Sequence, residues 1–313
     1  MTVRTSPAPE PTPFVATLLG STLGPDVVAA IRLRLDAAGL TPVAERTLST
    51  GPLIAVELRL CLPGGAAPAE LAEELQAIRT QSACDLVLQP DLPSRCRKRL
   101  AVFDMDSTLI QQEVIDELAR QVGAFDRVAD ITRRAMAGEL AFDAALRERV
   151  ALLRGAPVQV LTDVLAAIAP TPGVERLLPA LRRMGCKTAV LSGGFLAITE
   201  PIRQRLGLDF AHANELEVID GHLSGRVIGP IVNRQRKAQL LREIAAQEGV
   251  ALADVMAVGD GANDLDMLAA AGLGVAFCAK PVVQRAAPAV INQPRLDAVL
   301  YLLGLTDAEI DAE

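Results

Sequence analysis

The chain has 313 residues, half of them hydrophobic, so it has room for about two domains with a sizeable core and does not belong to the disordered class. Its formal net charge is −7 and only 3% of its residues are aromatic. Because an acidic chain repels phosphodiester backbones and offers few rings for base stacking, we expect no nucleic-acid partner.

Residues 1–13 are rich in proline and are expected to form a disordered tail, because they have little to bury. They contain no apolar core of a signal peptide, and the longest apolar run, 267–279, is too short to span a bilayer. We therefore expect a cytoplasmic protein with no membrane partner. Five widely spaced cysteines without a Cys-x-x-Cys pair argue against zinc binding and against a disulfide framework.

The segment 14–93 has the pattern of a small α+β domain. Strands are expected at 14–20, 41–50, 53–62 and 84–89, and helices at 26–38 and 68–80. The order βαββαβ predicts a ferredoxin-like split βαβ sandwich. This element order resembles the ACT domains, regulatory modules that bind an amino acid and pair with a second copy. A ferredoxin-like appendage that serves only dimerisation or solubility is the alternative.

Residues 94–99 are expected to link this domain to a second one. The wider stretch 90–99 holds two prolines and four cations. A basic cluster this short is interpreted as a solvated surface run rather than as a nucleic-acid patch.

In residues 100–313 helices alternate with apolar strands, which predicts a doubly wound, mostly parallel α/β sheet. The first strand runs into Asp104, and others are expected at 187–191, 254–258, 274–277 and 289–291. Four helical segments between 111 and 168 are interpreted as a cap inserted at about 110–170. Asp220-Gly221 lies between two short strand patterns and predicts a hairpin.

Polar loops follow three of these strands, at Asp104, Ser192 and Asp260. The carboxyl ends of parallel strands meet at one edge of the sheet, so we expect these side chains to converge. Asp104 and Asp106 lie two positions apart and share a face on an extended backbone, although such a pair alone is equally compatible with a capping turn. Asp104, Asp260 and Asp264 offer hard oxygen ligands suited to Mg²⁺.

The ordered set DMDST (104–108), SGG (192–194), Lys237 and GDGANDLD (259–266) resembles the haloacid dehalogenase-type phosphatases, and among them the phosphoserine phosphatases, over about residues 100–304. The resemblance implies that Asp104 attacks phosphorus and becomes an aspartyl phosphate. It implies that Asp106 protonates the leaving alkoxide and later deprotonates the attacking water.

The same resemblance implies the remaining roles around phosphate and metal. Mg²⁺ would be held by Asp104, Asp260 and the backbone carbonyl of Asp106, with Asp264 in support. Phosphoryl oxygens would be bound by Ser192 and the Gly193 amide, with Lys237 and Asn263 close to the phosphate.

The resemblance assigns substrate selection to the cap. Glu113 would meet the substrate ammonium, and Arg149 would grip its carboxylate, since a planar guanidinium suits a two-oxygen partner. Arg147 and Arg154 are competing candidates for that carboxylate. Met136 and Phe142 match apolar cap positions that cover the substrate.

The expected function is magnesium-dependent hydrolysis of O-phospho-L-serine to L-serine and phosphate, the last step of serine biosynthesis. L-serine would then be the regulator bound by the N-terminal domain, and a homodimer would form through that domain. Two alternatives stay open. One is a phosphotransferase that passes the phosphoryl group to another alcohol such as homoserine, and the other is an amino-acid sensor with a vestigial catalytic half.

Overall fold

The computed structural model describes residues 13–61, 75, 77–79, 84–136 and 139–312, which form two compact units. One unit contains the N-terminal residues up to Cys96 and the C-terminal residues from Leu300, and the other spans Arg97–Val299. The predicted tail and most of the predicted helix 68–80 lie outside the described residues. Within the described ranges, no helix combines the length and the apolar character needed to cross a bilayer.

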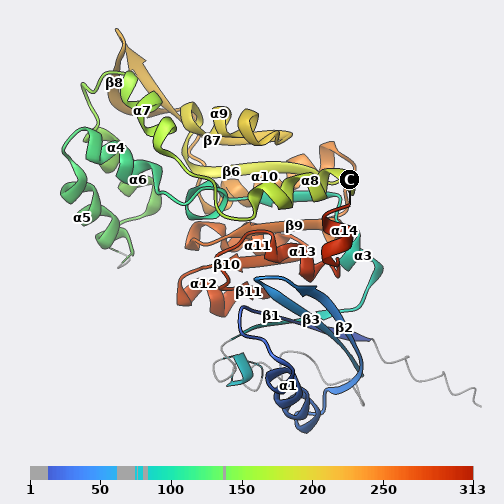
Figure 1. Ribbon diagram of the computed structural model, residues 1–313. Coiled ribbons are helices and arrows are strands. Elements are labelled where there is room, and N and C mark those ends of the chain that lie inside the picture. Colours follow the sequence, from blue (N-terminus) through green and yellow to red (C-terminus); the bar gives the residue numbers. More distant parts are fainter. Residues whose placement is uncertain (1–12, 62–74, 76, 80–83, 137–138, 313) are drawn as a thin grey trace, which may run out of the picture. The chain divides into compact units, whose positions relative to one another are not determined.

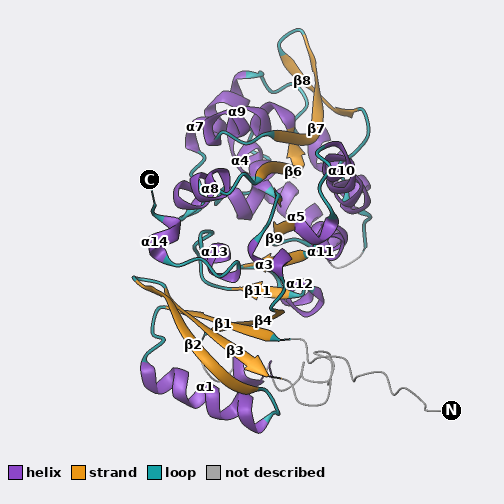
Figure 2. Cartoon of the chain, turned by 90° about the vertical axis from the view of Figure 1, so that its right-hand side faces the viewer, coloured by secondary structure: helices purple, strands orange, loops and turns teal. Residues whose placement is uncertain are grey.

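The first unit contains a four-stranded antiparallel sheet in the order β2-β3-β1-β4. Its elements are β1 (Phe14–Gly20), α1 (Pro25–Ala37), β2 (Thr41–Thr50), β3 (Ile54–Cys61) and β4 (Asp85–Pro90). Figure 2 shows α1 against one face of this sheet, where alternate apolar residues of β1 and β3 and the apolar face of α1 form a core. This strand order is that of the predicted split βαβ sandwich.

The opposite face of this sheet is also buried. Glu57 on β3 pairs with Arg95 of the short helix α3 (Pro93–Cys96), and both side chains are almost fully buried. Gln89 and Arg95 donate to the Leu302 carbonyl, which belongs to the C-terminal segment. The interpretation of 90–99 as a solvated basic run is therefore wrong for Arg95, and also for Lys98, which is 3% exposed and donates to the Ala253 carbonyl at 2.7 Å.

The second unit is built on a seven-stranded sheet in the order β11-β10-β9-β5-β6-β7-β8, parallel except for β8. Its strands are β5 (Leu100–Phe103), β6 (Lys187–Phe195), β7 (Phe210–Ile219), β8 (His222–Ile228), β9 (Val255–Gly259), β10 (Leu273–Phe277) and β11 (Ala289–Ile291). The chain runs outward from β5 in both directions, so β5 lies at the topological switch point where such sheets bind ligands.

Helices cover both faces of this sheet, as the doubly wound prediction requires. The helices α10 (Arg234–Gln247), α11 (Leu265–Ala270) and α12 (Pro281–Ala286) pack on the face that carries Leu100 and Val102. Ala101 and Phe103 point the other way and are also fully buried. The helices α8 (Val174–Arg183) and α9 (Leu196–Leu206) contact β6. The chain ends with α13 (Ala298–Leu302) and α14 (Asp307–Ile310).

Four helices inserted after β5 form the predicted cap. They are α4 (Val114–Gln121), α5 (Phe125–Met136), α6 (Phe142–Ala151) and α7 (Gln159–Ala167), and Figure 1 shows α4, α5 and α6 gathered at one end of the sheet. The two segments that connect the cap to the sheet pair with each other. The Gln111 amide donates to the Ala169 carbonyl at 3.0 Å, and the Thr171 amide donates to the Leu109 carbonyl at 2.9 Å.

The strand predicted at 187–191 continues to Phe195. Its pairing with β7 is irregular between Leu191 and Phe195, where Ser192, Gly193 and Gly194 lie. An irregularity of this kind redirects side chains and backbone groups at the end of a strand, and here it determines the conformation of the Ser192–Gly194 loop.

Candidate active site

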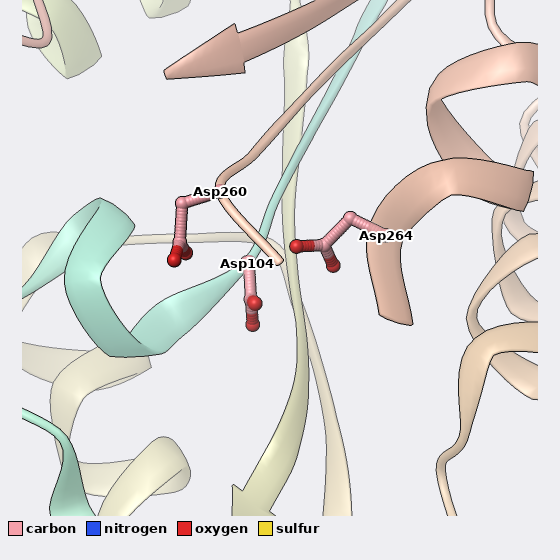
Figure 3. Close-up of side chains that lie close together, drawn as sticks. All are labelled: Asp104, Asp260 and Asp264. Atoms are coloured by element: carbon pink, nitrogen blue, oxygen red, sulfur yellow. The ribbon is translucent and has the colours of Figure 1, made fainter. Parts of the chain in front are cut away.

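Three carboxylates meet at the carboxyl edge of the seven-stranded sheet. Asp104 follows β5, Asp260 follows β9, and Asp264 precedes α11. One oxygen from each lies within 4.8 Å of the others, and Figure 3 shows Asp264 pointing toward Asp104, with Asp260 alongside. The convergence expected for Asp104 and Asp260 is therefore present.

Lys237 lies beside these carboxylates with no exposed surface. Its Nζ atom is 2.8 Å from Asp104 Oδ1 and 2.6 Å from Asp264 Oδ1. Burial by itself lowers the pKa of Lys237, but the two carboxylates outweigh it and raise the pKa above the usual value. The ammonium therefore stays charged and compensates part of the buried negative charge.

The other two acids of the cluster are held by local donors. Thr108 Oγ1 donates to Asp260 Oδ1 at 3.1 Å, and the Gly261 amide donates to Asp264 Oδ2 at 2.9 Å. Burial, followed by the charge of Asp104, raises the pKa of Asp260 to about 7 and the pKa of Asp264 well above its usual range. A concentration of buried acids with one lysine leaves uncompensated negative charge, which suits a divalent cation.

Asp106 lies in the irregular turn Met105–Leu109, where Ser107 adopts a left-handed φ of 54°. Among the described residues, the buried Oδ1 atom of Asp106 has no hydrogen-bond partner. Burial, together with the charges of Glu113 and Asp104, raises the pKa of Asp106 well above its usual range. A carboxyl group of this kind can hold a proton at neutral pH, as a general acid must. The unpartnered oxygen and the donor set both fit a site that takes a metal ion and a polar substrate.

Ser192 is fully buried, and its Oγ atom accepts the Gly194 amide at 2.8 Å. In this hydrogen bond the Ser192 hydroxyl oxygen is the acceptor, so its hydrogen can be donated to another group. Asn214 holds the same loop, since its Nδ2 atom donates to the Gly193 carbonyl at 2.8 Å and to the Gly194 carbonyl at 3.2 Å.

Glu113 is on the cap side of the site, at the residue that precedes α4. Ser107 Oγ donates to its Oε1 atom at 2.8 Å. Burial raises the pKa of Glu113, while the Ser107 hydrogen bond opposes the rise.

Arg149 of α6 is half-buried, and its Nη1 atom is 3.4 Å from Thr132 Oγ1. Burial lowers the pKa of Arg149, while the charges of Glu113, Asp116 and Asp106 raise it, so this guanidinium lies within electrostatic range of these acids. The competing candidates Arg147 and Arg154 are exposed.

Phe142 and Asn263 both lie close to Gly193. A Cβ atom built on Gly193 would lie 3.0 Å from Phe142 Cζ and 3.6 Å from Asn263 Nδ2. Met136, in contrast, is 62% exposed at the end of α5, where Lys280 Nζ is 3.7 Å from its sulfur atom. Phe142 therefore lies against the Ser192–Gly194 loop, whereas Met136 lies beside Lys280.

Sequence reasoning missed Asn214 and the hydrogen bond from Thr108 to Asp260. Thr108 belongs to the DMDST motif, so its position was a usable signal. Asn214 lies within a strand, outside every motif, and only the fold brings it to the Ser192 loop.

Comparisons with known proteins agree with this geometry. The sequence model of the haloacid dehalogenase-like hydrolases matches residues 101–269. A phosphoserine phosphatase of Streptomyces coelicolor is 46% identical over 298 residues, which cover 95% of this chain and 72% of the relative. A solved haloacid dehalogenase family hydrolase of Salmonella enterica serovar Typhi superposes with a TM-score of 0.82 at 31% identity, covering 93% of this chain and 98% of that one. A phospho-aspartyl intermediate analogue of a phosphoserine phosphatase superposes with a TM-score of 0.63 at 43% identity, covering 66% of this chain and 98% of that one.

Proposed function

The chain belongs to the haloacid dehalogenase-like hydrolases, and we propose that it is a magnesium-dependent phosphoserine phosphatase. It hydrolyses O-phospho-L-serine to L-serine and phosphate, as the last step of serine biosynthesis. The single observation that carries the proposal is the arrangement of Glu113 and Arg149, an acid and a guanidinium, on the cap side of the Asp104 cluster. The acid binds an ammonium group, and the forked guanidinium binds a carboxylate. Together they select an amino-acid phosphate over a sugar phosphate.

Asp104 is the nucleophile. Its carboxylate attacks phosphorus, the bond to the serine oxygen breaks, and an aspartyl phosphate forms. Lys237, 2.8 Å away, neutralises charge shared by this carboxylate and the phosphoryl group. The phospho-aspartyl analogue described for a phosphoserine phosphatase that is 43% identical supports this route.

Asp106 moves the proton in both halves of the reaction. Its raised pKa supports a protonated carboxyl that gives its proton to the departing serine alkoxide. The resulting carboxylate then takes a proton from the water that attacks the aspartyl phosphate. Ser192 and the Gly193 amide hold phosphoryl oxygens, and Asn263 lies beside them.

Asp104, Asp260 and the backbone carbonyl of Asp106 would hold Mg²⁺, with Asp264 in support because Lys237 and the Gly261 amide already engage its oxygens. When bound, Mg²⁺ offsets the repulsion between the nucleophile and the phosphoryl group and stabilises charge that develops on the phosphoryl oxygens.

A phosphate-release screen over phosphorylated amino acids and sugar phosphates, with and without Mg²⁺, tests this function. We expect O-phosphoserine to be the preferred substrate and the activity to require the metal. A preference for a sugar phosphate would contradict the role of the cap while leaving the family assignment in place.

L-serine is proposed as a regulator that binds the N-terminal unit, and a homodimer is proposed to form through that unit. In support, a cavity of about 280 Å³ lies between α1 and the sheet, with Arg32, Glu45 and Thr47 among its lining residues. Arg32 and Glu45 form an ion pair of 2.9 Å and are able to meet a carboxylate and an ammonium. If R32A leaves serine inhibition unchanged, this cavity is not the regulatory site. Light scattering with and without serine tests the dimer.

A further inference from the structure

One hydrogen bond joins the cap to the helix that carries Lys237. Asn233 Nδ2 donates to Asp143 of α6, at 3.1 Å to Oδ1 and 3.4 Å to Oδ2. Both side chains are half-buried, and neither residue belongs to a motif that the sequence analysis singled out.

Asn233 also fixes the start of α10. Its side-chain Oδ1 accepts the Arg236 amide at 3.1 Å, which makes it the N-cap of the helix. Its backbone carbonyl accepts the Lys237 amide at 2.9 Å. One residue therefore sets the first turn of α10, from which Lys237 reaches Asp104.

Asp143 is next to Phe142 in the first turn of α6. Phe142 is the cap residue that lies against Gly193, so the Asn233 hydrogen bond holds the part of the cap that lies against the Ser192–Gly194 loop. The connections between cap and sheet, at Leu109–Thr171 and Gln111–Ala169, are paired backbone segments. Such a paired connection permits a hinge motion, and a polar contact far from it in sequence can then hold the closed position.

We propose that Asn233 and Asp143 are positioning residues that form the latch of the closed cap. Their hydrogen bond couples closure of the cap over the substrate to the position of Lys237 beside the nucleophile. This inference rests on the proposed phosphoserine phosphatase activity for its kinetic tests, but its structural test does not depend on the substrate.

The chain allows a matched set of variants that separates the latch from the N-cap. D143A removes the acceptor and leaves the α10 cap intact. D143N keeps a neutral acceptor for the Asn233 amide. N233D keeps a good N-cap but places two carboxylates opposite each other. The double variant N233D/D143N exchanges the two groups, so that the side-chain amide now on α6 donates to the carboxylate now at the start of α10.

We expect D143A and N233D to raise the KM for O-phosphoserine about tenfold, with kcat changed by no more than about threefold, because a charge-assisted hydrogen bond is lost from the closed state only. D143N and the exchanged double variant should stay within about threefold of the wild type. A role limited to helix capping predicts instead that D143A and N233D are both harmless, because both keep the α10 N-cap, and this result would overturn the proposal. Failure of the exchanged double variant to recover what N233D loses would overturn it as well.

Hydrogen exchange of peptides from α6 gives the readout that is independent of the substrate. We expect faster exchange in D143A and N233D, and wild-type exchange in the double variant. Unchanged exchange in D143A overturns the latch. If the wild-type protein fails to hydrolyse O-phosphoserine while D143A still exchanges faster, the proposed function fails and the latch stands.

Discussion

The Nζ atom of Lys237, a residue with no exposed surface, lies 2.8 Å from Oδ1 of Asp104. The same ammonium also lies 2.6 Å from Asp264, so a single cation compensates two buried carboxylates. Lys237 is therefore expected to contribute both to the stability of the protein and to the reaction at Asp104.

Replacing Lys237 by Met should therefore lower both kcat and the free energy of unfolding. We expect K237M to lower kcat by about 10²–10³-fold, because the charge that faces the nucleophile is lost. We also expect a loss of about 3–5 kcal/mol in the free energy of unfolding, because two buried carboxylates lose their partner. Steady-state kinetics and urea unfolding measure the two effects.

Lys187 supplies the matched control. It is a half-exposed lysine of the same unit that pairs with Asp209 at 2.8 Å. K187M should leave the free energy of unfolding and kcat close to the wild-type values, because a solvent-exposed ion pair contributes little. Equal losses in the two variants would contradict the role of Lys237.

The pKa of Asp260 predicts how pH affects the metal-free protein. Burial, and then the charge of Asp104, raises it from 3.8 to about 7, so the folded state favours the protonated form. The free energy of unfolding should fall as pH rises from about 4 to about 7 and should change no further from this group above that range. Thermal unfolding in EDTA across this interval measures the slope, which D260N should reduce. Identical slopes in wild type and D260N would contradict the account.

Arg149 should be needed only for substrates that carry a carboxylate. We expect R149A to raise the KM for O-phosphoserine by about 10- to 100-fold, because a charge-assisted pair is lost. O-phosphoethanolamine lacks the carboxylate, so its kcat/KM should be the same in R149A and in the wild type. R147A, which changes an exposed arginine of the same helix, should behave as the wild type. An equal loss on both substrates in R149A would show that the arginine has another role.

The Ser192–Gly194 loop, the proposed phosphate site, should not tolerate a methyl group at Gly194. A Cβ there would lie 3.0 Å from Ser192 Oγ and 3.2 Å from Asp106 Oδ2, so one of these groups must move. We expect G194A to lower kcat/KM by more than about tenfold with little change in unfolding temperature, because small displacements of reacting groups are costly. In G24A the new Cβ meets no described atom within 4 Å, and activity should be unchanged. Wild-type activity in G194A would argue against this loop as the phosphate site.

The buried pair of Arg95 and Glu57 should stabilise the N-terminal unit without affecting catalysis. R95M leaves the Glu57 carboxylate buried and unpaired, and we expect a loss of about 3–5 kcal/mol. R59M breaks a pair with Asp91 in which the arginine is 57% exposed, and it should cost no more than about 1 kcal/mol. Urea unfolding distinguishes the two, and a large loss of kcat in R95M would contradict the separation of roles.

Much of the fold was predictable because local signals agree with the tertiary structure. The strands at 14–20, 41–50 and 289–291 have the predicted bounds, and Asp220-Gly221 forms the turn between β7 and β8. The meeting of Asp104 and Asp260 followed from one topological rule, since parallel strands place their carboxyl ends together.

The remaining features depend on contacts between distant segments. Asn214 and Asn233 form hydrogen bonds with partners that no local sequence pattern specifies. Arg95 has the sequence context of a surface cation, and only its contact with the C-terminal segment buries it. The short helices α11, α12 and α14 were missed because four to six residues carry too little periodicity to predict a helix.

The central claim is that Asp104 carries the phosphoryl group during turnover. The most direct test is intact-protein and peptide mass spectrometry after an acid quench of the wild type and D104N, each mixed with O-phosphoserine and Mg²⁺. The account predicts one added phosphoryl group on the peptide that contains Asp104 in the wild type, and neither modification nor turnover in D104N. Turnover by D104N, or a phosphoryl group on another residue, would contradict it.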